Sequence, residues 1–355
     1  MTKYFILIFF SLYFIYSVNA QENLLAYYNN VNKAEIAITK ESYKKAGRFY
    51  RRAFSNKQIP FAVDLYNSII TNIKINRTDD AILQCFQLAK YRVGKNFFIN
   101  NSSLTSLRKL QKWHELLNNI DSIENSNKLY NPEILLALNP ILNKDFNTHH
   151  EWQISNKNNK LKEEMHKIDD SLSNNLIGLF QKYGYLSEYK IGASVQCDTL
   201  LLFQPIFYII LLHNYQNISR KDTIFSPILR NGLNNGEVTP TFFSVVQDHG
   251  SNIEERIFYG NTLYVSYLGS LYRTKDILDS NIKKGTYNTY INKLRKTIYL
   301  CPIEDLEKKI FYNINNPNSE FRIFGPADKI VAFSDKESEE FFYKNSVLIR
   351  KNINK

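Results

Sequence analysis

The chain has 355 residues, with 45 Lys and Arg against 34 Asp and Glu, and a formal net charge of +11. Gly and Pro are sparse, at 12 and 9, whereas Tyr and Phe number 24 each, which favours long helices with aromatic packing over an all-β fold. The positive charge alone permits nucleic-acid binding. Because no nucleic-acid motif occurs and the charges are dispersed, we expect no nucleic-acid partner. Association with an anionic surface is the less specific interpretation of the positive charge.

Residues 1–20 have the organisation of a secretory signal peptide. Lys3 is followed by an apolar run over 5–16, and Val18 and Ala20 are small residues before a cleavage point at Gln21. The apolar run is short for a membrane span, and an uncleaved anchor is the alternative. We predict an exported protein, periplasmic or extracellular, whose mature chain of about 335 residues has no transmembrane segment and forms two or three domains.

The three cysteines are Cys85, Cys197 and Cys301. They show no CxxC or Cys/His ligand spacing, so we expect no structural zinc site and no cofactor. All three lie in apolar surroundings, which favours buried free thiols. A Cys197–Cys301 disulfide is the alternative.

Apolar residues recur every three or four positions between residues 21 and 123, which predicts helices. The spacing of Ala46, Tyr50, Ala53 and Phe54 returns thirty-five residues later as Ala81, Cys85, Leu88 and Ala89. This segment resembles tetratricopeptide repeats, whose period is about 34 residues. The resemblance implies two or three helical hairpins with a concave surface for a peptide or protein partner. An irregular helical bundle is the alternative, and the Lys44, Lys45, Arg48, Arg51 and Arg52 cluster is interpreted as a solvated helix face.

Residues 124–160 are interpreted as a linker. Pro132 and Pro140 bracket a short predicted helix, and the polar run that includes His149, His150 and Glu151 follows. Adjacent residues point in different directions, so these three are poorly placed to chelate one ion. We therefore expect a solvated linker and no metal site here.

Residues 161–275 are predicted to form a compact helical domain. A helix over 161–183 ends before Gly184, and a buried helix begins near Pro205 and carries His213 at its C-terminal end. Thr239 caps a further helix with Pro240 at its first position, which ends at Asp248, His249 and Gly250.

This part of the chain contains a series of short polar and glycine motifs. They are Asp169, Asn174-Asn175, Tyr183-Gly184-Tyr185, Ile191-Gly192, His213, Gly236-Glu237, Asp248 and Tyr259-Gly260. In this order they resemble an uncharacterised domain of unknown function that recurs in secreted and envelope proteins of bacteria. The resemblance places candidate binding residues at Asn174, Tyr259 and Gly260. The chain departs from that pattern at His249, where the family has Arg, and at Ile257, where it has Gln.

The candidate catalytic residues are His213, Asp248 and His249, because a carboxylate can orient an imidazole for acid–base chemistry. No GxSxG, HExxH or glycine-rich phosphate loop accompanies them. A structural histidine bonded to a turn carboxylate is therefore the favoured interpretation, and an enzyme is the less favoured one. A metal site from these three scattered residues is weaker still.

Residues 276–355 are predicted to form a C-terminal extension. We expect a helix over 270–300, a hairpin from the segments 320–325 and 329–333, and a last helix through Leu348. The predicted fold is mainly α: tetratricopeptide-like hairpins, a compact helical domain and a small mixed α/β extension. The predicted function is a protein–protein interaction or scaffold module; the alternative is a hydrolase-like or small-ligand pocket around His213 and Asp248.

Overall fold

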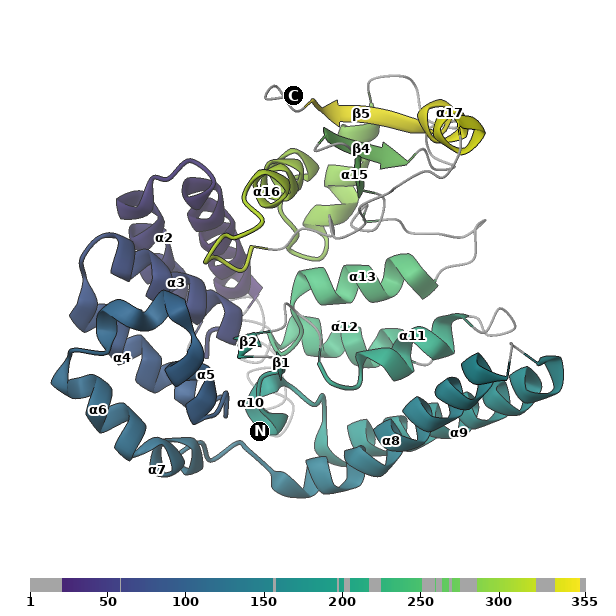
Figure 1. Cartoon of the computed structure of the whole chain (residues 1–355), viewed down its shortest axis with the longest axis horizontal. Helices are drawn as coiled ribbons and strands as arrows, with labels where there is room; N and C mark the ends of the chain where they lie inside the picture. The colour runs from purple at the N-terminus through teal and green to yellow at the C-terminus, as the bar shows by residue number, and fades with distance from the viewer. Residues whose placement is uncertain are drawn as a thin grey trace, which may run out of the picture.

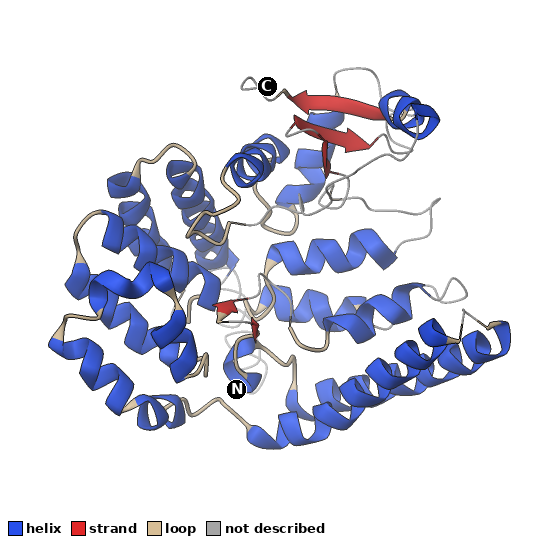
Figure 2. Ribbon diagram, viewed as in Figure 1, coloured by secondary structure: helices blue, strands red, loops and turns tan. Residues whose placement is uncertain are grey.

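The computed structural model describes residues 21–57, 59–155, 158–196, 198–200, 205–216, 225–250, 259, 264–267, 270–274, 286–323 and 336–351. Helices dominate it, and two small antiparallel sheets are the only β-structure among these residues (Figure 2). The predicted mainly α fold with a small α/β extension is confirmed. The described part of the chain contains no helix of the length and apolar character that membrane crossing requires.

A stack of helices forms the N-terminal part (Figure 1). A helix over residues 21–38 is followed by α2 (Tyr43–Asn56), α3 (Ala62–Lys74), α4 (Thr78–Ala89), α5 (Lys95–Asn100), the 3-10 helix η1 (Ser102–Leu107), α6 (Gln111–Asn118) and α7 (Ile120–Asn125). The small residues Ala46, Ala53, Ala81 and Ala89 are buried, as their spacing predicted. Without bulky side chains at these positions, neighbouring helices can approach closely.

The middle part contains α8 (Pro132–Ile154), α9 (Asn159–Tyr183), α10 (Glu188–Ile191), α11 (Tyr208–Gln216), α12 (Ser226–Asn234) and α13 (Pro240–Gly250), with a short ladder of β1 (Val195–Gln196) and β2 (Thr199–Leu200). Helices α8 and α9 form a long hairpin along one edge of the molecule, and α11 packs against α9 (Figure 1). The predicted helices α9 and α13 are confirmed, including the Thr239 cap, whose Oγ1 accepts from Phe242 N at 3.1 Å. The predicted helix that carries His213 is present as α11, but it begins at Tyr208, after the expected start near Pro205, and continues past His213 to Gln216.

The short helix predicted between Pro132 and Pro140 is present, but it continues to Ile154, so the prediction of a solvated linker after Pro140 is wrong. Pro140 was expected to end the helix, since proline has no N–H to donate to the carbonyl four residues earlier. That carbonyl belongs to Leu136, and both residues lie on the exposed face of α8. Water can satisfy the carbonyl there, so the proline is tolerated within the helix.

The C-terminal part holds β3 (Tyr264–Tyr267), β4 (Ser270–Thr274), α15 (Tyr287–Lys296), α16 (Ile303–Asn315), α17 (Lys336–Lys344) and β5 (Ser346–Arg350). The strand order is β3-β4-β5, all antiparallel. Two helix predictions are corrected: residues 270–274 form a strand, and Leu348 lies in β5. Strand β4 pairs with the adjacent β3 and with the distant β5, and β5 pairs only with β4 among the described residues. Pairing of this kind overrides the local helical pattern. Most of the predicted 320–333 hairpin lies outside the described residues.

Three hydrophobic cores are present among the described residues, one for each of these parts. Polar contacts join the first part to the third. The Lys309 ammonium of α16 donates to the Glu35 carboxylate at 2.5 Å, with each side chain only 7% exposed. The Asn67 side chain of α3 donates to Arg322 O at 2.9 Å and accepts from Arg322 N at 2.7 Å.

Substitution of Lys309 by Met tests the buried ion pair. The change leaves the Glu35 charge buried and unpaired, so the free energy of unfolding should fall by about 3–5 kcal/mol. Chemical denaturation monitored by circular dichroism measures the loss. Lys308→Met is the matched control, because Lys308 pairs with Asp305 near the surface and should cost no more than about 1 kcal/mol. Equal losses in the two variants would contradict a structural role for the buried pair.

Candidate metal centre

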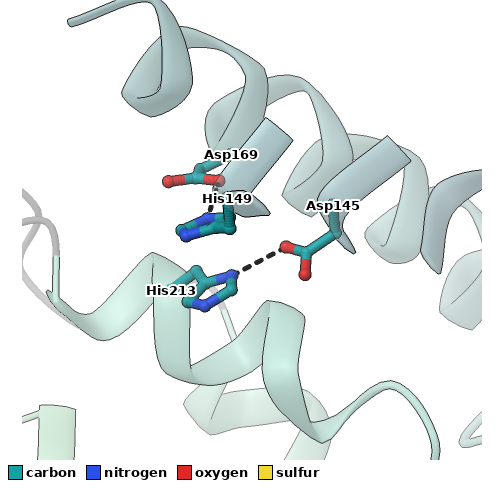
Figure 3. Close-up of side chains that lie close together, drawn as sticks. All are labelled: Asp145, His149, Asp169 and His213. Atoms are coloured by element: carbon teal, nitrogen blue, oxygen red, sulfur yellow. Dashed lines mark hydrogen bonds and ion pairs between the residues drawn. The ribbon is translucent and has the colours of Figure 1, made fainter. Parts of the chain in front are cut away.

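Two histidines and two aspartates from three helices converge in the middle part of the chain (Figure 3). Helix α8 contributes Asp145 and His149, α9 contributes Asp169, and α11 contributes His213. Asp145 and His149 are four residues apart, so the helical repeat places them on one face, directed towards α9 and α11. Because α8 continues beyond Pro140, the four-residue spacing places both side chains on the same helix face.

The four side chains form two histidine–aspartate pairs. His149 Nε2 lies 3.0 Å from Asp169 Oδ1, and His213 Nδ1 lies 2.7 Å from Asp145 Oδ1. The two imidazole rings stack with their centroids 3.4 Å apart and their planes 15° from parallel. One nitrogen or oxygen from each residue falls within a group whose members lie within 4.8 Å of one another.

Both carboxylates are withdrawn from solvent. The Asp145 side chain is 3% exposed and that of Asp169 is 2% exposed, whereas the histidines are somewhat more accessible. A buried carboxylate is costly unless hydrogen bonds or an opposite charge compensate it. Each histidine supplies that compensation to one aspartate, and a cation bound among the four would supply it to both.

His166 lies beside this group on α9, three residues before Asp169. Its Nδ1 is 3.7 Å from Asp169 Oδ2, which is too long for a hydrogen bond, and this buried atom has no hydrogen-bond partner among the residues that the structure describes. Next to His213, the Asn214 side chain donates to Ser173 Oγ at 2.9 Å and holds α11 against α9. These contacts constrain the positions of Asp169 and His213.

The ligand set suits a small, borderline-soft divalent ion. Zinc takes four nitrogen, oxygen or sulfur ligands in a tetrahedron with bonds of about 2.0–2.2 Å, which places the ligand atoms roughly 3.3 Å apart. The widest pair here would close by about 1.5 Å to reach that geometry, a movement that side-chain torsions can supply. Magnesium and calcium prefer six or more oxygen ligands, which this set of two nitrogens and two oxygens does not offer.

The structure separates the predicted catalytic residues. His213 belongs to the site, but its carboxylate partner is Asp145 and not Asp248. Asp248 instead accepts a hydrogen bond from the Tyr259 backbone N–H at 2.8 Å. The Asp248 carboxylate therefore fixes the backbone at Tyr259. The side chain of His249 lies outside the described residues, and the hydrogen bonds described for His213 and Asp248 join them to Asp145 and Tyr259, respectively.

The predicted binding residues lie elsewhere. Asn174 is exposed on α9. Tyr259 is buried, and its carbonyl accepts from Arg295 Nη1 at 2.5 Å, an arrangement that serves packing. Gly260 lies outside the described residues. Neither Asn174 nor Tyr259 belongs to the histidine–aspartate group.

Sequence analysis missed Asp145, His149 and Asp169 as site residues. The expectation of a solvated linker is wrong for His149, whose side chain is largely buried and pairs with Asp169. One signal was available: Asp145 and His149 are four apart, and His166 and Asp169 are three apart, so each pair shares a helix face if its segment is helical. The interpretation of Pro140 as a helix end removed that signal.

A second set of buried ionisable groups lies where the N-terminal and middle parts meet. Burial lowers the pKa of Lys57 to about 8 and raises the pKa of Glu188 to about 7. Glu188 Oε1 accepts from Ala62 N, the first residue of α3, at 2.7 Å, and the Lys57 ammonium lies 3.9 Å from the centroid of the Phe61 ring. Glu188 therefore caps the start of α3, which is a structural role.

The histidine–aspartate pairs can be tested without any metal. In the presence of EDTA, His213→Ala should lower the free energy of unfolding by about 1–3 kcal/mol, because Asp145 is left buried without its partner. His150→Ala is the matched control, since His150 is exposed on α8 and should change stability by no more than about 0.5 kcal/mol. Urea titration measures both; similar small losses would refute the pairing.

Comparison with protein families, with curated proteins and with solved structures found no match for this chain. The resemblances to tetratricopeptide repeats and to the bacterial domain of unknown function therefore remain predictions. The inference of function rests on the side-chain geometry of the described residues.

Proposed function

We propose that this chain is a metal-binding protein that holds one divalent transition-metal ion, zinc foremost, between Asp145, His149, Asp169 and His213. The observation that carries the proposal is the convergence of four ligand atoms from α8, α9 and α11 within 4.8 Å of one another. Two imidazole nitrogens and two carboxylate oxygens are ligands that zinc accepts in a tetrahedral site.

The number of protein ligands favours a structural role for the ion. Four protein ligands complete a tetrahedron, whereas catalytic zinc sites keep one position for water or substrate. The ion would join the α8–α9 hairpin to α11 and neutralise two buried carboxylates. The ligand set contains no thiolate, so disulfide formation cannot remove any of the ligands. This property suits the exported location that residues 1–20 predict.

Zinc binding can be measured on the mature chain, residues 21–355, after removal of metals with a chelator. Isothermal titration calorimetry should give one zinc per chain. Loss of a residue that only supports a ligand by a hydrogen bond costs about 10–100-fold in metal affinity, so removal of a ligand itself in His149→Ala or Asp169→Asn should weaken binding by more than about 100-fold. His150→Ala should bind as the unaltered chain does, and magnesium should not bind at this site. Equal zinc affinity of His149→Ala and His150→Ala would exclude the proposed site.

Zinc should also stabilise the fold by mass action. At a free concentration 100 times the dissociation constant, an ion that binds only the folded state adds about 2.7 kcal/mol to the free energy of unfolding. Differential scanning calorimetry with and without zinc measures the shift. Asp169→Asn should abolish it; a shift that persists in this variant would place the ion elsewhere.

A second candidate function is the binding of a protein or peptide partner by the N-terminal helices. The specific observation is a groove of about 530 Å³ lined mainly by α2, α3 and α4. Ligand pockets typically measure about 300–1,000 Å³, so the groove is large enough to take part of an extended chain. It lies in the part predicted to form helical hairpins, whose packed repeats present concave binding surfaces.

A further inference from the structure

Helices α2, α3 and α4 follow one another in the N-terminal stack (Figure 1). Residues from all three helices line the groove. Its lining residues include both charged and apolar side chains. Two cations, Arg51 and Lys90, line it, and neither forms an ion pair with any residue that the structure describes. The lining carboxylate, Asp80, lies 3.5 Å from Arg77 Nη1 and is therefore balanced by it. The groove carries net positive charge.

The positive charge continues along the outer face of α2. This helix carries five cations and no acidic residue, and all five are exposed: Lys44, Lys45, Arg48, Arg51 and Arg52. At about 100° per residue they fall within an arc of roughly 120°, opposite the buried Ala46, Tyr50 and Ala53. Such a continuous cationic stripe raises the local concentration of anionic partners and their rate of association.

The rest of the groove offers contacts that suit a peptide. The side-chain amides of Asn72, Gln84 and Gln87 line it, and amides can donate to and accept from a peptide backbone. Asn72 and Gln84 are linked by a hydrogen bond of 3.0 Å, which fixes their orientation. Leu83 is 53% exposed on α4 although it is apolar, and it also lines the groove. An apolar side chain of a partner can cover it.

We infer that the groove between α2, α3 and α4 binds an extended peptide segment rich in Asp and Glu. Carboxylates of the peptide pair with Arg51 and Lys90, its backbone bonds to the lining amides, and an apolar residue packs on Leu83. The inference rests on the partner-binding function proposed above and names the chemistry of the partner. A flat anionic surface would use the outer face of α2 alone and would leave the groove residues Lys90 and Leu83 without a role.

A library of random displayed decapeptides, selected on the immobilised mature chain, tests this inference. Selected peptides should be enriched in Asp and Glu, and their affinity should fall more than tenfold in the Arg51→Glu/Lys90→Glu double variant. Lys293→Glu/Lys296→Glu is the matched control, because it makes the same charge change at exposed positions of α15 and should bind normally. Circular dichroism verifies that all variants are folded.

The other outcomes overturn the inference in distinguishable ways. Neutral or basic peptides that bind and are lost in Leu83→Ser would keep the groove as a partner site but contradict an acidic partner. A selection without any enriched peptide would remove both the inference and the partner-binding function. The mature chain could instead bind vesicles of phosphatidylglycerol while no peptide is enriched. If only the double charge variant then loses vesicle binding, the cationic residues would be assigned to a lipid surface.

Discussion

Two buried carboxylates set the main constraint on the middle part of this protein. Asp145 and Asp169 are buried beside a core of apolar side chains from the same helices, and each needs a partner that compensates its lost hydration. His213 and His149 provide these partners from α11 and α8. The pairing fixes the rotation of three helices about their own axes, because each ligand must reach a common centre (Figure 3).

The same constraint explains why the group suits a metal ion. Two histidine–aspartate pairs hold the ligands near one another before any ion arrives, so part of the ordering cost of binding is already met. The stacked imidazoles leave the four ligand atoms slightly too far apart for tetrahedral coordination. A bound ion would draw them together and replace two separate pairs by a single centre that links α8, α9 and α11.

Polar contacts recur where the separate cores meet. Lys309 and Glu35 connect α16 to the first helix, the Asn67 amide holds the backbone of Arg322, and Glu188 caps the start of α3 from the middle part. Apolar packing is tolerant of small shifts, whereas each of these contacts needs defined donor and acceptor positions. They therefore specify how the N-terminal helices sit against the rest of the chain, including the groove formed by α2, α3 and α4.

The amino-acid sequence by itself determined the helical character of the chain, the buried faces of the N-terminal helices and the positions of α9, α11 and α13. Those features depend on periodicity and capping, which involve residues close in sequence. It also placed His213 near the end of a buried helix. Only the tertiary structure decided that Asp145 is its partner, because they are 68 residues apart and meet through the packing of α11 against the α8–α9 hairpin. Pro140 illustrates the reason, because whether a proline ends a helix depends on which side of the helix faces solvent. Strand β5 likewise depends on pairing with β4, a segment distant in the sequence, which no local pattern encodes.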